Sequence, residues 1–283
     1  METSIKGDEA YCFNLSTGAM STISLPIIAH DIFSMPTLGA FVTETGSTYN
    51  NEKYYYEATL IDITGNVIRV FDDVIPSTFY HHPTEKIVFF FSGYQPNETV
   101  VATAINYYEY ENDKLITVDI DDVGFEALDT YMDFNPNDDF LYWSGDHGVV
   151  YKIDTKDMKN VVSGSEGFVF NNSGDRSAKY GPDAVKIYSN GTLDMTIPHS
   201  DLPFYRGYSV ELHWYDDDYL ILMVGGMFIS CNIKIGTYTE TTNLGRTYTF
   251  SKATKTFYRA IVTKKSCTLE TIDVSTCLHK DTP

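Results

Sequence analysis

The feature of this sequence that most limits its fold is a strand-turn-strand pattern that recurs six times. Each copy has an apolar entry, a short polar turn and an apolar strand that usually ends at or near a glycine. The residues that precede the six turns are Phe33, Tyr80, Phe134, Phe170, Leu212 and Phe250. Successive members of this set lie 36 to 54 positions apart. Because apolar runs on both sides of a short polar turn favour antiparallel pairing, we predict six β-hairpins.

Most of these hairpins are followed by a second one with alternating polarity. Thr59–Ile63 and Val67–Val70 flank the turn Gly65-Asn66. Val185–Tyr188 precedes Asn190-Gly191, in which both residues tolerate the positive φ that a tight hairpin turn requires. Two hairpins for every 40 to 50 residues are typical of a four-stranded propeller blade. The 22 Tyr and 17 Phe also suit half-buried strands.

The two ends of the chain carry incomplete repeats. Tyr11–Gly18 looks like a second hairpin without a first, and the last repeat has only Cys267–Ile272 after its first hairpin. We therefore predict an all-β, six-bladed β-propeller closed by N-terminal strands that join the C-terminal blade, as a single domain over residues 1–283. Such closure pairs sheet edges that would otherwise invite association.

Some turns resemble those of known propeller families. Phe134–Trp143 resembles the strand-turn-strand repeat of six- and seven-bladed propellers in general. Leu141–Asp146, followed by Val150–Asp154, is similar to one repeat of the YWTD receptor propellers. Val224-Gly225-Gly226 resembles the double glycine of kelch repeats, although the downstream Trp of that family is missing. The resemblance implies an adaptable binding scaffold and no particular substrate.

The charge balance excludes one class of partner. Lys and Arg number 20 against 39 Asp and Glu, which gives a formal net charge of −19. A polyanion is repelled by such a field, and the basic residues near the C-terminus are few and scattered, so we predict no nucleic-acid partner. No apolar run reaches the roughly 18 residues of a membrane span, so we expect no membrane insertion.

The compartment stays open between cytoplasm and secretion. The N-terminus lacks the apolar core of a signal peptide, which favours the cytoplasm. An even number of cysteines and four glycosylation sequons, at Asn14, Asn97, Asn171 and Asn190, favour secretion. Closure of the propeller would bring Cys12 near Cys267 or Cys277, where a disulfide could form.

A first set of candidate residues is expected at the central channel. In a propeller the entrances of the first strands face this channel, and ligands converge there. The candidates are His30, Asp129, Glu166 and Glu211. Acids beside a histidine could serve a hydrolase or lactonase, with or without a divalent cation. The alternative is that they cap strands and face solvent.

No assembled catalytic motif accompanies these residues. The sequence lacks a Gly-x-Ser-x-Gly elbow and a phosphate-binding glycine loop. Acidic runs such as Asp119–Asp122 lack the spacing of a calcium loop and are interpreted as turns on a solvated rim. We therefore predict neither a cofactor nor a metal site.

A second set of candidates lies in connections between blades. It comprises Phe204, Tyr205, Arg206 and Arg246. Two arginines beside aromatic rings on an acidic protein would form a positive spot for a carboxylate or an acidic glycan, unless a neighbour such as Asp201 neutralises them. Tyrosine-rich runs such as Tyr54–Tyr56 either pack between blades or contact a partner. The sequence thus favours a non-enzymatic module that binds a protein or glycan, with a hydrolase or lactonase as the alternative.

Overall fold

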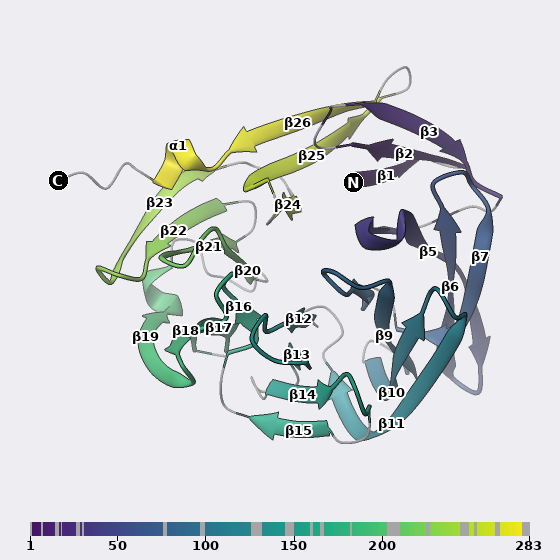
Figure 1. The fold of residues 1–283 in the computed structure, drawn as a ribbon, viewed down its shortest axis with the longest axis horizontal. Helices are drawn as coiled ribbons and strands as arrows, with labels where there is room; N and C mark the ends of the chain where they lie inside the picture. The colour runs from purple at the N-terminus through teal and green to yellow at the C-terminus, as the bar shows by residue number, and fades with distance from the viewer. Residues whose placement is uncertain are drawn as a thin grey trace. The chain divides into compact units, whose positions relative to one another are not determined.

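The computed structural model shows a chain built almost entirely of β-strands (Figure 1). It describes residues 2–6, 8–14, 17, 19–26, 29, 31–75, 78–96, 100–125, 132–144, 150–158, 161–164, 167–181, 183–202, 210–224, 227–243, 249–251, 254–263 and 267–278. Within these ranges the only α-helix is the single turn α1 (Ser275–Leu278), and no helix is long and apolar enough to cross a membrane. The chain divides into two compact units.

The first unit comprises residues 1–130 and 262–267. Its N-terminal sheet is β1 (Glu2–Lys6), β2 (Glu9–Phe13) and β3 (Met20–Ser24). An eight-stranded sheet follows, in the order β11-β10-β9-β7-β6-β5-β4, with β8 paired to β9. Its strands are β4 (Ile32–Met35), β5 (Ala40–Asn50), β6 (Lys53–Asp62), β7 (Val67–Val74), β8 (Tyr80–His81), β9 (Ile87–Tyr94), β10 (Val100–Glu109) and β11 (Lys114–Phe125).

The second unit comprises residues 131–261 and 268–283. Three four-stranded antiparallel sheets and one three-stranded sheet succeed one another along the chain. The four-stranded sheets are β12 (Met132–Phe134) to β15 (Val161–Gly164), β16 (Val169–Phe170) to β19 (Thr192–Pro198), and β20 (Val210–Trp214) to β23 (Thr237–Asn243). Between these bounds lie β13 (Phe140–Ser144), β14 (Val150–Asp154), β17 (Arg176–Tyr180), β18 (Ala184–Ser189), β21 (Tyr219–Val224) and β22 (Met227–Asn232). The last sheet is β24 (Thr249–Ser251), β25 (Thr256–Val262) and β26 (Cys267–Asp273).

All six predicted hairpins are present, each as an antiparallel pair at its expected turn. In five of the turns a polar side chain accepts hydrogen bonds from the backbone N–H groups that follow it, and these residues are His82, Asn135, Asn171, Asp216 and Ser251. Such side chains satisfy backbone donors that the reversing chain would otherwise leave without a partner. The polar turn of the repeat is therefore a local folding signal.

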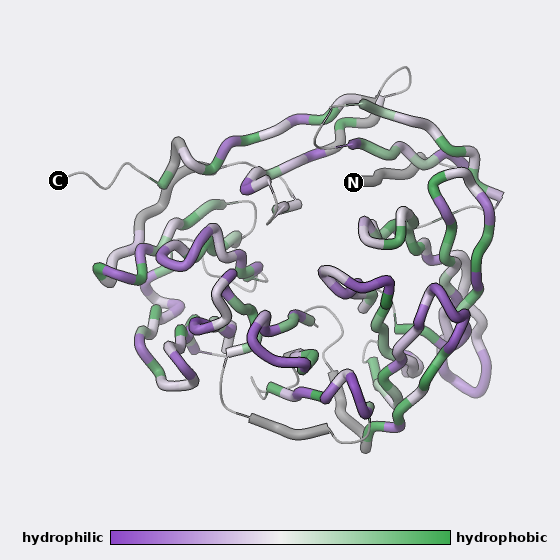
Figure 2. Tube along the Cα trace, in the orientation of Figure 1, coloured by the Kyte–Doolittle hydropathy of each residue, from purple (hydrophilic) through white to green (hydrophobic). Residues whose placement is uncertain are grey.

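The inner strands of the first unit are buried on both faces. Ala40 and Val42 of β5 contribute to one hydrophobic cluster, together with residues of β6, β7, β9 and β10. The intervening Phe41 points to the other face and packs with Ala10 and Ile23 of the N-terminal sheet. Outer strands have one exposed face instead, and Figure 2 shows hydrophobic and hydrophilic residues alternating along many strands. The continuous apolar sequence of β5 is thus covered by strands of its own sheet on one face and by the N-terminal sheet on the other.

Sheets of the second unit also pack face to face. One cluster joins residues of the three four-stranded sheets, and the buried Trp214 of β20 donates a 2.8 Å hydrogen bond from its indole Nε1 to the carbonyl oxygen of Val169. A second cluster joins β21 and β22 to Phe257 of β25 and to Leu278 of α1. Successive sheets therefore stack through hydrophobic faces within each unit.

Closure by the N-terminal strands stays a prediction. The strands β1–β3 form a sheet of their own in the first unit, and β24–β26 form a three-stranded sheet in the second. The blade number of six and the single domain also stay predictions. The first two predicted repeats share one eight-stranded sheet because β7 pairs with β9 at Val74 and Ser92.

Most of the sequence features that favoured secretion can be placed. The sequons at Asn14 and Asn190 are exposed, and Asn97 lies outside the described residues. The Asn171 side chain is buried, and its amide group donates to Ser173 and Asp175 while its carbonyl oxygen accepts from Arg176 N–H, so this sequon is not accessible to a glycan in the folded protein. Cys12 is a free, buried thiol on β2, and burial raises its pKa to about 11. The side chains of Cys267 and Cys277 lie outside the described part of the chain.

The turn after β16 offers a test of this folding signal. Gly174 has a φ of +72°, and a Cβ there would lie 2.3 Å from Asn135 Oδ1 and 2.7 Å from Asn137 Nδ2. Gly191 has a similar φ of +75° but open space around it. We expect Gly191→Ala to lower the free energy of unfolding by about 1 kcal/mol through backbone strain alone. Gly174→Ala should cost about 2 to 3 kcal/mol, because the two amide groups must move and would lose their hydrogen bonds with Asn137 N and Ser173 O. Equal losses in denaturant titrations would contradict the proposed crowding at Gly174.

Candidate functional site

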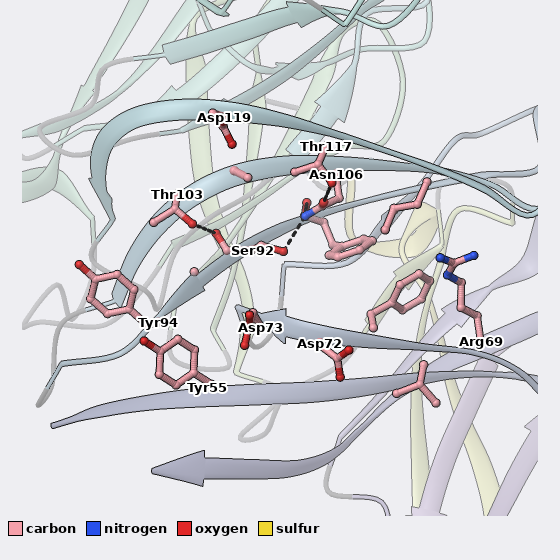
Figure 3. Close-up of a pocket in the computed structure, with 16 residues that line it drawn as sticks. Tyr55, Arg69, Asp72, Asp73, Ser92, Tyr94, Thr103, Asn106, Thr117 and Asp119 are labelled. Carbon is pink, nitrogen blue, oxygen red and sulfur yellow. Dashed lines mark hydrogen bonds between the residues drawn. The ribbon is translucent and has the colours of Figure 1, made fainter. Parts of the chain in front are cut away.

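A groove opens within the first unit where β7 separates from β9. Within the described strands, β7 and β9 share one register pair, Val74 and Ser92, reinforced by a 2.9 Å hydrogen bond from Ile75 N to Phe91 O. From Val67 to Asp73 the outer edge of β7 has no register partner on β9, and a cavity of about 430 Å³ lies beside it (Figure 3). We call this cavity the β7–β9 groove; it is lined by residues 69–73, by Tyr55 and by one face of β9–β11.

The floor of the groove is one face of three paired strands. Side chains of a strand alternate between faces, so every second residue points into the groove. The registers place these residues in rows across the strands: Ser92, Ala104 and Asp119 in one row, Phe90, Asn106 and Thr117 in the next. The floor is therefore polar where the groove is open. It becomes apolar toward Phe71, Phe90 and Tyr108, which pack in the hydrophobic core.

A buried amide fixes the polar part of the floor. Asn106 is 2% exposed, and its Nδ2 donates to Ser92 Oγ at 2.7 Å and to Phe90 O at 3.5 Å. Its Oδ1 accepts a 2.8 Å hydrogen bond from Thr117 Oγ1 (Figure 3). The hydrogen-bonding groups of the amide are thus used between three strands. Because buried polar groups are costly to leave without partners, this network holds the floor in one arrangement.

Two β-bulges shape the walls. Opposite Glu57 of β6, strand β7 has two residues, Asp72 and Asp73, and Asp73 has a φ of +55°. On β10, Thr103 is an extra residue relative to β9. A bulge redirects side chains from the alternation of a regular strand. The bulge on β7 therefore lets two consecutive carboxylates line the same groove.

Aromatic rings stand at one end of the groove. The rings of Tyr55 and Tyr94 have centroids 6.2 Å apart and are tilted by 44°. Paired backbone hydrogen bonds between Tyr54 and Gln95, at 2.9 and 3.0 Å, hold the two strands together beside them. The Nζ atom of Lys53 lies 3.7 Å from the centroid of the Tyr94 ring, a close cation–π contact.

Arg69 lies at the opposite end (Figure 3) and is neutralised there. Its guanidinium forms an ion pair with Asp113 and lies 5.1 Å from the centroid of the Tyr108 ring. Tyr108 donates from its hydroxyl to Asp113 Oδ1 at 3.1 Å. Burial and this hydrogen bond raise the pKa of Tyr108 to about 12, while the hydrogen bonds from Arg69 and Tyr108 lower the pKa of Asp113.

The remaining charges of the groove are therefore negative. Asp72, Asp73 and Asp119 are exposed, and in the described part of the chain they form no ion pair. No cluster of three or more acidic, histidine or cysteine side chains in this part is arranged to hold a metal ion. The carboxylates are spread along the groove, which suits a ligand that spans several ångströms.

One of the residues predicted as candidates can be placed. Glu211 lies half-buried on β20, and its Oε2 atom is 3.3 Å from Nε2 of His213 on the same face of the strand. The other candidates lie outside the described residues: His30, Asp129, Glu166, Phe204, Tyr205, Arg206 and Arg246. Their convergence at a central channel or a rim stays a prediction.

Sequence reasoning did not find the β7–β9 groove, although it noticed two of its parts. Tyr55 belongs to the tyrosine run that was weighed as a possible contact surface. Asp119 was assigned to a turn on a solvated rim, whereas it lies within β11. The bulge at Asp72 and Asp73 leaves no pattern in the sequence, because two neighbouring acids in a strand normally point to opposite faces.

Comparisons with known proteins place the fold. No protein-family model matches this chain, and no curated protein matches it. A chain in a crystal structure of the mitotic checkpoint complex aligns over 96% of this chain and 86% of its own length, with 10% identity and a TM-score of 0.61. Hsv2 from Kluyveromyces lactis aligns over 94% and 92%, with 11% identity and a TM-score of 0.52. A second Hsv2 structure, with a complete loop 6CD, aligns over 95% and 93%, with 11% identity and a TM-score of 0.54.

These neighbours are β-propellers of the WD40 type, and the chain shares their all-β fold. At such low identities the likeness concerns the fold alone. It agrees with the stacked antiparallel sheets of both units, and it assigns neither a ligand nor a reaction.

Replacing the amide of the floor should destabilise the protein in a pH-dependent way. In Asn106→Asp, burial raises the pKa of the new carboxyl above its unfolded value of about 3.9, so the penalty is small below that pH and grows as the pH rises. At pH 7 we expect a loss of about 3 kcal/mol, because the charge is buried without a partner. Thr117→Val removes the donor to Asn106 Oδ1 and introduces no charge, so it should cost about 1 to 2 kcal/mol, equally at both pH values. Denaturant titrations at pH 4 and pH 7 measure the free energy of unfolding of both variants. If Asn106→Asp were as stable as the wild type at pH 7, the Asn106 amide would not be what holds the floor in place.

Proposed function

We propose that this chain is a non-enzymatic module that binds another protein, and that the β7–β9 groove is a contact surface for that partner. The observation that carries the proposal is the combination of a hydrogen-bonded floor with half-buried rings and with exposed carboxylates and apolar side chains along the rim. Val70 and Leu115, which line the groove, are 45% and 37% exposed. Exposed apolar side chains beside polar ones in one concavity are typical of recognition surfaces.

The character of the side chains favours recognition. The amide and hydroxyl groups of the floor are engaged with one another, as the hydrogen bonds of Asn106 illustrate. The groups that remain available are the ring of Tyr55 and the three carboxylates, while Lys53 lies over the ring of Tyr94. Tyrosine gives contact area at small entropic cost, and the fixed floor lowers the cost of ordering the groove when a ligand binds.

The fold supports a protein partner. One of the structural neighbours is a component of a protein assembly, the mitotic checkpoint complex, and propeller scaffolds with low sequence identity commonly differ in what they bind. A glycan ligand and a hydrolase or lactonase activity are the other predictions from the sequence. Both depend on the candidate residues at the channel and the rim, and of these the structure describes only Glu211. The side chain near Glu211 in the described part of the chain is that of His213.

A selection of random linear peptides displayed on phage, with the full chain as bait, tests this proposal. We expect it to yield peptides whose binding is lost in Thr103→Trp, because an indole on the exposed bulge of β10 fills the groove. The matched control is Thr196→Trp, an exposed threonine on β19, which should bind the same peptides as the wild type.

Both variants should keep the wild-type melting temperature, since both threonines are exposed. Peptides that bind Thr103→Trp and the wild type equally would place the contact surface elsewhere. Recovery of no specific peptide from repeated selections would count against a protein-binding module.

A further inference from the structure

We infer that the ligand of the β7–β9 groove is an extended segment of a partner protein that inserts an arginine or lysine side chain between the carboxylates of the groove. This inference rests on the proposed function and adds the chemistry of the partner. Three features of the groove carry it: the sign of its unpaired charges, the apolar side chains beside them, and the rings at its end.

The unpaired charges call for a cation. Asp72 and Asp73 project from the bulge on β7, and Asp119 lies across the floor on β11. The basic group nearest to them among the lining residues, Arg69, is held by Asp113 at one end of the groove. A ligand cation would thus meet carboxylates from two walls without competition from a resident ion pair. An anionic ligand would meet repulsion from the same groups.

The apolar side chains beside the unpaired charges, toward the Arg69–Asp113 pair, suit a long aliphatic stem. Val70 on β7 and Leu115 on β11 both line the groove and are both substantially exposed. Arginine and lysine carry a charged head on three or four methylene groups, and these stems cover apolar surface while the head stays polar. A metal ion or a small inorganic cation has no such stem and would leave Val70 and Leu115 uncovered. The lining therefore favours a side chain over a free ion.

The rings already hold a cation in this structure. The Lys53 ammonium lies over the Tyr94 ring at 3.7 Å, and Tyr55 stands beside it with its centroid 6.2 Å from that of Tyr94. This contact is independent of the three aspartates. Lys53 already lies over Tyr94, so a ligand cation would have the Tyr55 ring beside it. Carboxylates along the groove and rings at its end thus select for the same ligand charge.

The edge of β7 favours an extended partner. From Val67 to Asp73 this edge pairs with no described strand, and residues 69–73 all line the groove. An extended segment laid along such an edge presents every second side chain to one wall. Basic residues at alternate positions would then reach the carboxylates in turn.

The peptides selected for the proposed function supply the probes. We expect those that lose binding to Thr103→Trp to be enriched in arginine and lysine over the starting library. Replacing each arginine of such a peptide with citrulline, or each lysine with norleucine, removes the charge while keeping most of the stem. Binding measured by fluorescence anisotropy should weaken about fivefold or more, because the peptide loses its ion pairs with the carboxylates of the groove.

Two protein variants with equal changes of net charge separate local from global electrostatics. Asp72→Asn/Asp119→Asn should weaken binding of the charged peptide by about fivefold and leave binding of the citrulline peptide unchanged. The control, Asp8→Asn/Asp183→Asn, removes two exposed carboxylates that do not line the groove and should change the affinity less than about twofold.

The outcomes distinguish the two proposals. Groove-dependent peptides that show no basic enrichment, or that bind equally well as citrulline analogues, overturn the cationic ligand and leave the groove as a contact surface. Equal weakening by both double variants overturns it as well, because the effect would then follow the net charge. Failure to recover any groove-dependent peptide overturns the proposed function together with the ligand.

Discussion

The need to cover both faces of the inner strands determines the rest of this structure. Strand β9 has five consecutive buried residues, Ile87 to Phe91, so neither of its faces can be left in water. Each buried large apolar side chain contributes about 2 kcal/mol, and a sheet of such strands is stable only between two other layers. The sheets of each unit therefore stack. Along β9–β11 the cover ends where the residues become Ser92, Thr117 and Asp119, and the groove opens there.

The groove is thus a place where the sheet is left uncovered, and hydrogen bonds and an ion pair hold the side chains that line it. A cavity lined by exposed polar side chains would ordinarily be adaptable. Here Asn106 links three strands through its amide, and the ion pair of Arg69 with Asp113 ties β7 to the turn between β10 and β11. The hydrogen bonds reduce the conformational cost that a partner must overcome on binding. The bulges place the carboxylates without disturbing the ladder on either side of them.

The hairpins could be predicted from the sequence because each is specified by residues a few positions apart. The groove could not, because it depends on how separate strands align. The six hairpins followed from polar turn residues such as Asn135 and Asp216, which cap the backbone within a few positions of themselves. The row of Ser92, Ala104 and Asp119 depends on how three strands align, which no single segment encodes. A bulge at Asp72 and Asp73 breaks the period-two alternation on which prediction of an exposed face rests. The candidate residues were chosen because first strands of propeller blades enter the central channel. That rule cannot reveal a groove between two strands of one sheet.

Net charge and local charge have different consequences for this protein. A net charge of −19 produces a field that draws in any basic partner and repels polyanions, and salt screens it over about 10 Å. Such a field raises the rate of encounter without distinguishing one basic segment from another. Discrimination requires groups that stay fixed while the ligand approaches, and the groove offers them in the rings of Tyr55 and Tyr94 and in carboxylates set by a bulge. Because Asp113 already neutralises Arg69, the groove keeps its negative sign close to the ligand, where screening is weakest. Long-range attraction and short-range selection therefore favour the same kind of segment for separate physical reasons.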